Sequence, residues 1–158
     1  MNFTAITTAY SIASWPKSLG KLDLGKRVLD IIPLPGHTKD SIAVYDRETG
    51  ILLTGDSVYP GRISIPQSDI AMFKASHARL ERFVKGRDVS WVLGCHVEQK
   101  KTAGEDYPEG TVLQPDEHVL QFPVGVLEDV RLALDDVDEG TRFGQIMFDE
   151  FSLVIIME

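Results

Sequence analysis

The segment Ile51-Leu52-Leu53-Thr54-Gly55-Asp56 is the clearest indication of the fold. Its apolar and β-branched residues predict a β-strand over 51–54, and the unbroken run of apolar residues at its start is typical of a strand that is buried on both faces. Gly55 permits a backbone bend that a side chain would obstruct. The strand therefore leads directly to Asp56, whose carboxylate can bind a divalent metal.

Two histidines occupy similar positions elsewhere in the chain. A predicted strand over 27–32 is followed by His37, and a predicted strand over 89–93 is followed by His96. Together with Asp56, these side chains lie where strands end in loops, and all three are of types that coordinate divalent metals.

Hydrophobic periodicity predicts the remaining elements. Apolar residues recur every three or four positions between Ser68 and Lys85, which predicts an amphipathic helix with Ser68 as its N-cap and Gly86 at its end. A second helix is expected around Val126 to Leu134. The other predicted elements are strands over 41–45, 143–147 and 151–157 and a polar loop over 99–116.

Three short motifs together resemble a known family. They are Pro35-Gly36-His37-Thr38 with Ser41, Thr54-Gly55-Asp56, and Leu93-Gly94-Cys95-His96. In this order and with these gaps they resemble the third, fourth and fifth metal motifs of the metallo-β-lactamase-fold hydrolases, from about Leu22 to near the end. Residues 46–62, 106–108 and 114–118 look like one subgroup of that superfamily. The resemblance implies an α/β fold, with helices and strands in separate α+β layers. We expect the second half of an αββα sandwich, in which helices cover one face of a mixed sheet.

One motif of that family has no counterpart in the sequence. The H-x-H-x-D-H motif, which supplies ligands to both metals there, is missing. We therefore expect residues 1–158 to form a single truncated domain with one core, in which residues 1–21 are an irregular leader. A natural short gene, a misassigned start and a cloned piece are all consistent with this length.

The resemblance also implies a metal site. In that family the counterpart of Asp56 bridges two metals, that of His37 binds one of them, and that of His96 binds the other. These three residues are therefore the expected ligands, and Asp56 is the expected catalytic residue, with water activated by the metal as the nucleophile.

Two imidazoles and a carboxylate suit zinc, and also iron or manganese. A single metal with three protein ligands and a water is the alternative. With the first motif missing, we expect the isolated chain to bind metal weakly or not at all.

Four other polar residues near these motifs are candidates for orienting the metal ligands. We expect hydrogen bonds from neighbouring side chains to orient the ligands, because metal-binding histidines usually donate their second nitrogen to a partner. The candidates are Thr38, Ser41, Tyr59 and Glu98. Thr38 and Ser41 have an alternative role, which is to satisfy the amides of their own loop.

Three further residues are not expected to be ligands. His77 lies on the apolar stripe of its helix, so we expect it to pack at the edge of the core. His118 lies in a turn-rich segment and is a weaker candidate for the rim of the site. Cys95, beside His96, has two readings: it could face the metal pocket, or it could be a small buried thiol. The second is expected, because free cysteines are more often buried, so Cys95 is not among the expected ligands.

Composition limits the compartment and the partners. A net charge of −8 and a pI near 5.0 disfavour nucleic-acid and anionic-membrane partners, which attract basic surfaces. A single cysteine excludes an internal disulfide framework. No stretch approaches the roughly 20 apolar residues of a membrane helix, and no signal-peptide pattern is seen, so the cytoplasm is the expected compartment.

The functional expectation is a metallo-β-lactamase-like, metal-dependent hydrolase relative that acts on a small molecule and has little or no activity alone. The alternative is a non-catalytic half-domain that forms a homo-oligomer or binds a partner chain. Residues 51–53 and 91–93 are both continuous apolar runs, and the two predicted helices can cover only one face of their sheet. We therefore expect the other face to be covered by a second copy in a homodimer, or by a missing amino-terminal half.

Overall fold

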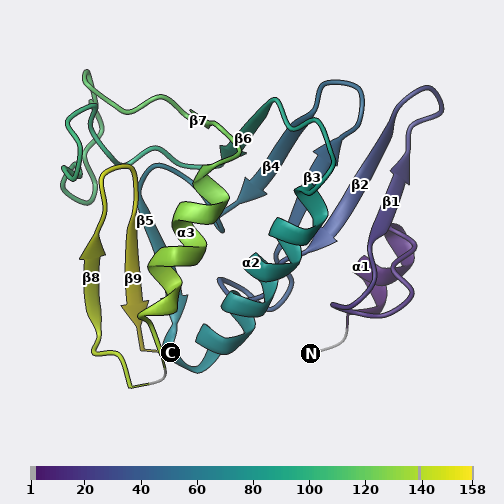
Figure 1. Ribbon diagram of the computed structural model, residues 1–158, viewed down its shortest axis with the longest axis horizontal. Helices are drawn as coiled ribbons and strands as arrows, with labels where there is room; N and C mark the ends of the chain where they lie inside the picture. The colour runs from purple at the N-terminus through teal and green to yellow at the C-terminus, as the bar shows by residue number, and fades with distance from the viewer. Residues whose placement is uncertain (1–2, 139, 158) are drawn as a thin grey trace.

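The computed structural model describes residues 3–138 and 140–157 (Figure 1). In chain order its elements are α1 (Thr4–Ala9), β1 (Gly20–Asp23), β2 (Val28–Pro33), β3 (Ile42–Asp46), β4 (Ile51–Gly55), β5 (Arg62–Pro66), a 3-10 helix (Gln67–Asp69), α2 (Ile70–Val84), β6 (Trp91–Gly94), β7 (Gln121–Phe122), α3 (Val126–Asp135), β8 (Gly144–Met147) and β9 (Ser152–Ile156).

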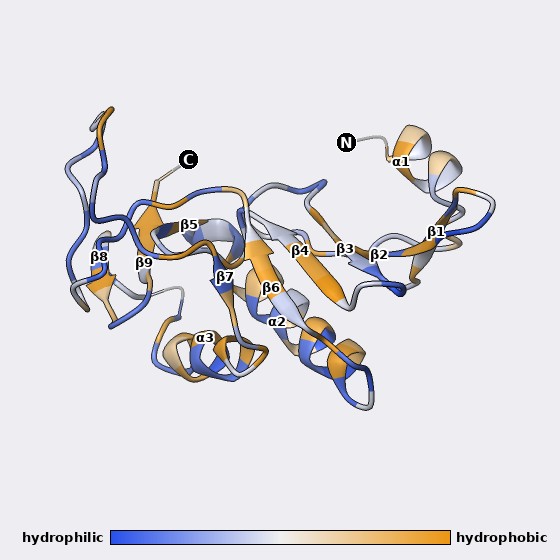
Figure 2. Ribbon diagram, turned by 90° about the horizontal axis from the view of Figure 1, so that it is seen from above, coloured by the Kyte–Doolittle hydropathy of each residue, from blue (hydrophilic) through white to orange (hydrophobic). Residues whose placement is uncertain are grey.

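The strands form two sheets. The larger sheet has the order β1-β2-β3-β4-β6-β7 and the smaller has the order β5-β9-β8. Within the larger sheet, β4 and β6 are parallel and the other pairs are antiparallel, so the sheet is mixed. Helices α2 and α3 lie on one side of it, and α1 lies on the other side near β1 (Figure 2). The expected α/β fold, with a mixed sheet covered by helices on one face, is confirmed.

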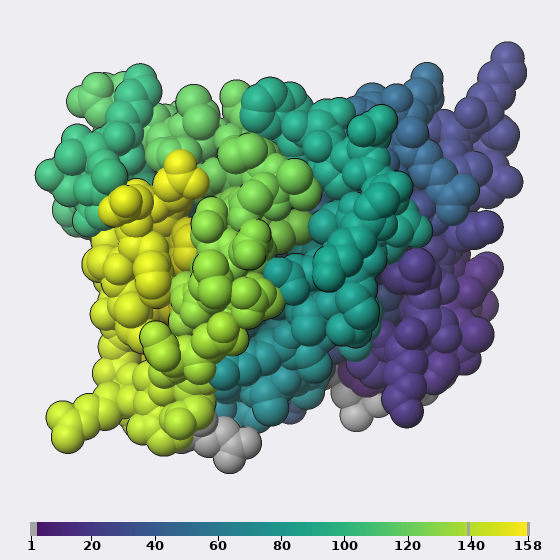
Figure 3. Space-filling model, viewed as in Figure 1, coloured from purple at the N-terminus to yellow at the C-terminus, as the bar shows by residue number. Residues whose placement is uncertain are grey.

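The core includes buried residues of the larger sheet, of α2 and α3, and of β5 and β9 in the smaller sheet. Leu52 on β4 and Val92 on β6 are completely buried on the side of the larger sheet that faces α2 and α3. Tyr45 on β3 packs edge to face against Phe83 of α2, with 5.5 Å between the ring centres. In the space-filling view, α2 and α3 pack side by side and cover this side of the sheet, in teal and green (Figure 3). Over β3, β4 and β6, the helices therefore pack against one face of the sheet.

The opposite face of these three strands carries apolar side chains in register. Val44 on β3 pairs with Leu53 on β4, Leu53 pairs with Leu93 on β6, and Ile51 pairs with Trp91. Leu53 and Trp91 are 46% and 47% exposed, whereas the other three are partly buried. We call these five residues the open sheet face. The expectation that the helices of this chain leave one sheet face uncovered is confirmed for these positions.

Several boundaries differ from the expectation. Residues 67–69 form a 3-10 turn before α2, so Ser68 does not cap the helix, and Asp69 precedes α2 without a side-chain cap hydrogen bond. Gly86 follows the end of α2 with a φ of +77°, as its proposed terminating role requires. Residues 1–21 are not irregular throughout, because they contain α1 and the start of β1.

Strand β5 was not predicted. It pairs in parallel with β9, whose residues follow about ninety positions later, so Arg62 lies opposite Ser152. Pairing over such a distance leaves no local periodic signal. The predicted terminal pair of strands is confirmed, since β8 and β9 are antiparallel neighbours. Among the described residues, no helix has the length and apolarity that crossing a membrane requires.

Candidate metal site

The site forms where neighbouring strands end. Strands β4 and β6 are parallel, with Gly55 opposite Gly94, so their carboxyl ends lie at the same edge of the sheet. Asp56 follows β4 directly, and His96 lies two residues beyond β6. The backbone amide of Cys95 donates to the carbonyl of Gly55 at 3.2 Å, which extends the contact between the two strand ends. Sequence positions 40 residues apart therefore meet in one loop cluster.

The structure brings together the three predicted ligands. One carboxylate oxygen of Asp56, Oδ1, lies 2.9 Å from Nε2 of His96. The other oxygen, Oδ2, lies 3.8 Å from Nε2 of His37. The two histidines therefore approach different oxygens of one carboxylate. This arrangement allows Asp56 to face two ions or to share one with either histidine.

Two glycines permit this approach. A Cβ atom on Gly36 would lie 2.6 Å from the Cα of Phe73, so only glycine allows the loop before His37 to press against α2. A Cβ atom on Gly94 would lie 2.2 Å from the Cβ of Tyr59 and 2.4 Å from the carbonyl oxygen of Val58. The close packing at Gly94 places the Cys95-His96 segment beside Asp56.

The ring of His37 is held by the backbone of the smaller sheet. Its Nδ1 lies 2.9 Å from the carbonyl oxygen of Ser64 in β5. A carbonyl can only accept, so Nδ1 donates in this contact, and in the neutral imidazole Nε2 is the nitrogen left to bind a metal. This is the partner that a metal-binding histidine usually has. The sequence does not reveal this partner, because a main-chain carbonyl leaves no signal in the residue type.

Four side chains were expected to orient the ligands. Their hydrogen bonds are instead made to groups other than His37, Asp56 and His96. The hydroxyl of Thr38 donates to Asp40 at 2.8 Å, and the hydroxyl of Ser41 accepts from the amide of Thr38 at 3.2 Å. These two residues stabilise their own loop, which was the alternative role. Glu98 accepts from the amide of Arg62 at 2.8 Å and forms an ion pair with its guanidinium at 3.2 Å.

Tyr59 is buried beside the site. Its hydroxyl donates to the carbonyl of Arg62, and its ring centre lies 5.2 Å from that of His96. Burial, followed by the nearby charges of Glu98 and Asp56, raises the pKa of Tyr59 above its ordinary value. The phenol therefore stays protonated and acts as a wall that packs against the imidazole of His96.

The expectation that Cys95 is a buried thiol is wrong. Cys95 is exposed rather than buried, and its Sγ lies 2.8 Å from Oδ1 of Asp56. One donor atom from each of Asp56, Cys95 and His96 lies within 4.8 Å of the other two. Partial shielding of the sulfur, together with the Asp56 contact, raises the pKa of the Cys95 thiol to about 12. The bend after Gly94 turns this side chain toward the site, which residue type alone does not reveal.

The two remaining histidines are not part of this cluster. His77 is buried in α2, with its ring centre 4.6 Å from that of Phe73, as expected for a core residue. Burial lowers the pKa of His77 to about 4, so the ring is neutral at pH 7. Nδ1 of His118 lies 2.7 Å from the carbonyl oxygen of Val119, and its ring packs near Phe122.

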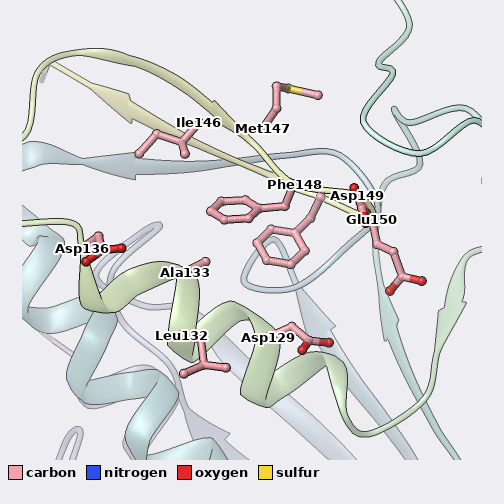
Figure 4. A pocket seen from close by; sticks show the side chains of 10 residues that line it. Asp129, Leu132, Ala133, Asp136, Ile146, Met147, Phe148, Asp149 and Glu150 are labelled. Atoms are coloured by element: carbon pink, nitrogen blue, oxygen red, sulfur yellow. The ribbon is translucent and has the colours of Figure 1, made fainter.

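A surface cavity lies elsewhere, between α3 and the turn that joins β8 to β9 (Figure 4). Leu132, Ile146 and Phe148 contribute to its lining, with several carboxylates around them. His37, Asp56 and His96 do not line this cavity. The chemistry-bearing residues are instead gathered at the ends of the strands.

Comparison with known proteins identifies the family. The sequence profile described as the metallo-beta-lactamase superfamily matches residues 5–96, more than half of the chain. The chain therefore belongs to the metallo-beta-lactamase superfamily. It is similar to proteins named acyl-coenzyme A thioesterase MBLAC2, with 38% identity over 77 residues to the Gallus gallus protein and 35% over 77 residues to the Homo sapiens protein.

These similarities are partial. Each match covers 48% of this chain and 28% of the relative, so the chain corresponds to about a quarter of the relatives' length. A metallo-beta-lactamase from Pontibacter korlensis superposes with a TM-score of 0.50 and 16% identity, over 77% of this chain and 47% of that one. This likeness supports the fold, and it covers about half of the Pontibacter chain.

Proposed function

We propose that this protein is a metal-binding relative of metal-dependent hydrolases, with His37, Asp56 and His96 as ligands. The carboxylate of Asp56 between the two imidazoles is the observation that carries the proposal. This donor set fits zinc, and iron or manganese are the alternatives. A bound divalent metal supplies Lewis acidity and lowers the pKa of water, which generates a nucleophile near neutral pH.

The residues of this chain would prepare the site for that chemistry. The carbonyl of Ser64 keeps Nε2 of His37 available as a donor atom. The position of Asp56 allows it to bind metal and to interact with an attacking water, which is why it is the proposed catalytic residue. Because Asp56 is partly exposed, a small-molecule substrate can reach it from solvent.

The proposed substrate class is a thioester. The support is the name of the relatives, acyl-coenzyme A thioesterase, which share 35–38% identity over 77 residues with this chain. Hydrolysis of a thioester requires attack of water on the carbonyl carbon, cleavage of the acyl C–S bond and release of the thiol. A metal held by Asp56 would supply the Lewis acidity for this reaction. Since the match covers 28% of each relative, the activity of those proteins is carried to this chain only as part of this proposal.

We expect the chain by itself to hydrolyse thioesters slowly or not at all. Its four histidines include no H-x-H pair, so two metals bridged by Asp56 would each have few protein ligands. A metal with few protein ligands is held less rigidly, so the attacking water is positioned less accurately. Small errors in this position lower the rate of hydrolysis strongly.

The test is an assay of acyl-coenzyme A hydrolysis with added zinc. We expect a rate close to that of buffer with zinc, together with zinc binding that Asp56→Ala removes. Robust zinc-dependent turnover that His96→Ala abolishes would show that the site is sufficient and would favour the one-metal arrangement. Zinc binding that is unaffected by Asp56→Ala would refute the ligand assignment.

A second candidate function is that of a non-catalytic, homo-oligomeric half-domain. The observation that favours it is the open sheet face, on which Leu53 and Trp91 are about half exposed beside Val44 and Leu93. In a two-fold arrangement of two copies, this row of apolar side chains on three adjacent strands would be buried against the same row of the second copy. We propose a second copy of this chain as the occupant, in preference to a separate amino-terminal half.

A further inference from the structure

We infer that Cys95 is a metal ligand, and that Asp56, Cys95 and His96 together hold one thiophilic divalent ion. This rests on the proposed metal-binding function: Cys95 joins Asp56 and His96 on one ion, while His37 faces the other carboxylate oxygen of Asp56. The ligand atoms are Oδ1 of Asp56, Sγ of Cys95 and Nε2 of His96, with the fourth position left for water. Three protein ligands and one open position are typical of catalytic zinc sites.

The distances are close to those that a zinc ion requires. Oδ1 of Asp56 lies 2.8 Å from the sulfur and 2.9 Å from the imidazole nitrogen, and all three donor atoms lie within 4.8 Å of one another. With zinc bonds of about 2.0–2.3 Å, the ligand atoms of a tetrahedral site are separated by roughly 3.3–3.7 Å. The donors therefore need to move by only about 1 Å to accept the ion.

The backbone holds these donors in place. Cys95 and His96 are consecutive, and the amide of Cys95 is bonded to the carbonyl of Gly55, the residue before Asp56. The close contact of Gly94 with Tyr59 restricts the same segment from the other side. Both side chains therefore reach the same carboxylate oxygen from a constrained loop rather than from mobile surface positions.

The sulfur of Cys95 would determine which metals the site prefers. A thiolate is a soft ligand that favours zinc and other thiophilic ions over manganese or magnesium. On binding, the S–H bond of Cys95 breaks, a sulfur–metal bond forms and the proton passes to the buffer. His37 faces the other carboxylate oxygen, Oδ2, at 3.8 Å, so it is outside the three-donor set and free to bind from the opposite side.

Cobalt(II) titration of the full chain tests the inference. A cobalt–thiolate bond gives a near-ultraviolet charge-transfer band, which oxygen and nitrogen ligands do not produce. We expect about one equivalent of cobalt with this band. In Cys95→Ser the charge-transfer band should disappear and the affinity should fall by at least about tenfold. The loss of an outer hydrogen-bond partner can weaken metal binding by a similar factor, so the band is the readout that identifies Cys95 as a ligand. Circular dichroism checks that the variant is folded, and His118→Gln is the matched control.

The outcomes separate this inference from the proposed function. Cobalt that binds in an Asp56-dependent manner without a charge-transfer band would overturn the role of Cys95 and leave the His37, Asp56 and His96 assignment in place. Cobalt binding that does not depend on Asp56 would overturn both. As a second measurement, zinc should slow the reaction of the Cys95 thiol with a disulfide reagent in the wild-type chain and not in Asp56→Ala.

Discussion

Nδ1 of His37 lies 2.9 Å from the carbonyl oxygen of Ser64, and this contact joins the two sheets at the candidate site. His37 follows β2 of the larger sheet, whereas Ser64 belongs to β5 of the smaller one. The orientation of one proposed ligand thus depends on how the two sheets are placed. Correct packing of β5 against β9 is therefore a condition for the metal site as well as for the fold.

The first prediction concerns the ligands. Asp56→Ala should weaken zinc binding by well over tenfold, and His37→Ala should weaken it by less, because Asp56 faces every other donor in the cluster. Isothermal titration calorimetry measures both. Asp40→Asn is a suitable control, since the Asp40 carboxylate accepts a hydrogen bond from the loop residue Thr38 and is not one of the proposed ligands. Stoichiometric zinc that survives chelation in both variants would contradict the assignment.

The second prediction concerns Gly94. Gly94→Ala would place a methyl group 2.2 Å from the Cβ of Tyr59, so the strand end must move away from the β4–β5 loop. We expect a loss of about 1–3 kcal/mol in the free energy of unfolding, together with weaker metal binding. Urea denaturation and zinc titration are the measurements.

Gly125→Ala is the matched control for this substitution. Within the part of the chain that the structure describes, no atom lies within 4 Å of a Cβ at Gly125, and its φ of −56° is helical. This variant should retain the wild-type stability and zinc affinity. An equal effect of both substitutions would show that the close contact at Gly94 is not what positions Cys95 and His96.

The third prediction concerns pH. Burial lowers the pKa of His77 to about 4, below its ordinary value of 6.5. The unfolded chain therefore binds more protons at this residue between these values, so the contribution of His77 to stability is complete above pH 6.5 and is lost as the pH decreases toward 4. This contribution is at most about 3 kcal/mol.

Urea denaturation between pH 7.5 and pH 4.5 measures this effect. His77→Met replaces the ring with an apolar side chain of similar size, so the variant should show a shallower pH dependence than the wild type. His118→Gln removes a histidine that is not fully buried and should leave the dependence unchanged. Identical pH profiles for wild type and His77→Met would rule out His77 as the source.

The fourth prediction concerns assembly through the open sheet face. We expect a homodimer at micromolar concentration, because burying apolar surface contributes about 25 cal/mol per Å². Light scattering measures the mass. Leu53→Lys should give a monomer, since Leu53 lies at the middle of the apolar row between Val44 and Leu93.

Leu132→Lys is the control for assembly. Leu132 is 51% exposed on α3, which lies on the other side of the sheet, so this variant should remain a dimer. A wild-type monomer that binds no hydrophobic dye would contradict the prediction. It would mean that the open sheet face is covered within the chain.

The sequence by itself determined the local elements and the order of the site motifs. The apolar run over 51–53 predicted β4, and three-or-four spacing predicted α2, because these periodicities depend only on which side of an element faces the core. His37, Asp56 and His96 could be named for the same local reason, since each follows a predicted strand. The sequence also predicted that one face of the sheet is covered and the other is not, because it contains two amphipathic helices, which can cover one face.

Only the tertiary structure decided how these parts meet. Strand β5 pairs with β9 across about ninety positions, and the Ser64 carbonyl reaches His37 only because of that pairing. Cys95 was assigned to the interior by its residue type, yet the bend after Gly94 directs it to Asp56. Main-chain partners and close backbone contacts depend on coordinates rather than on side-chain chemistry. Local periodicity carries no information about them.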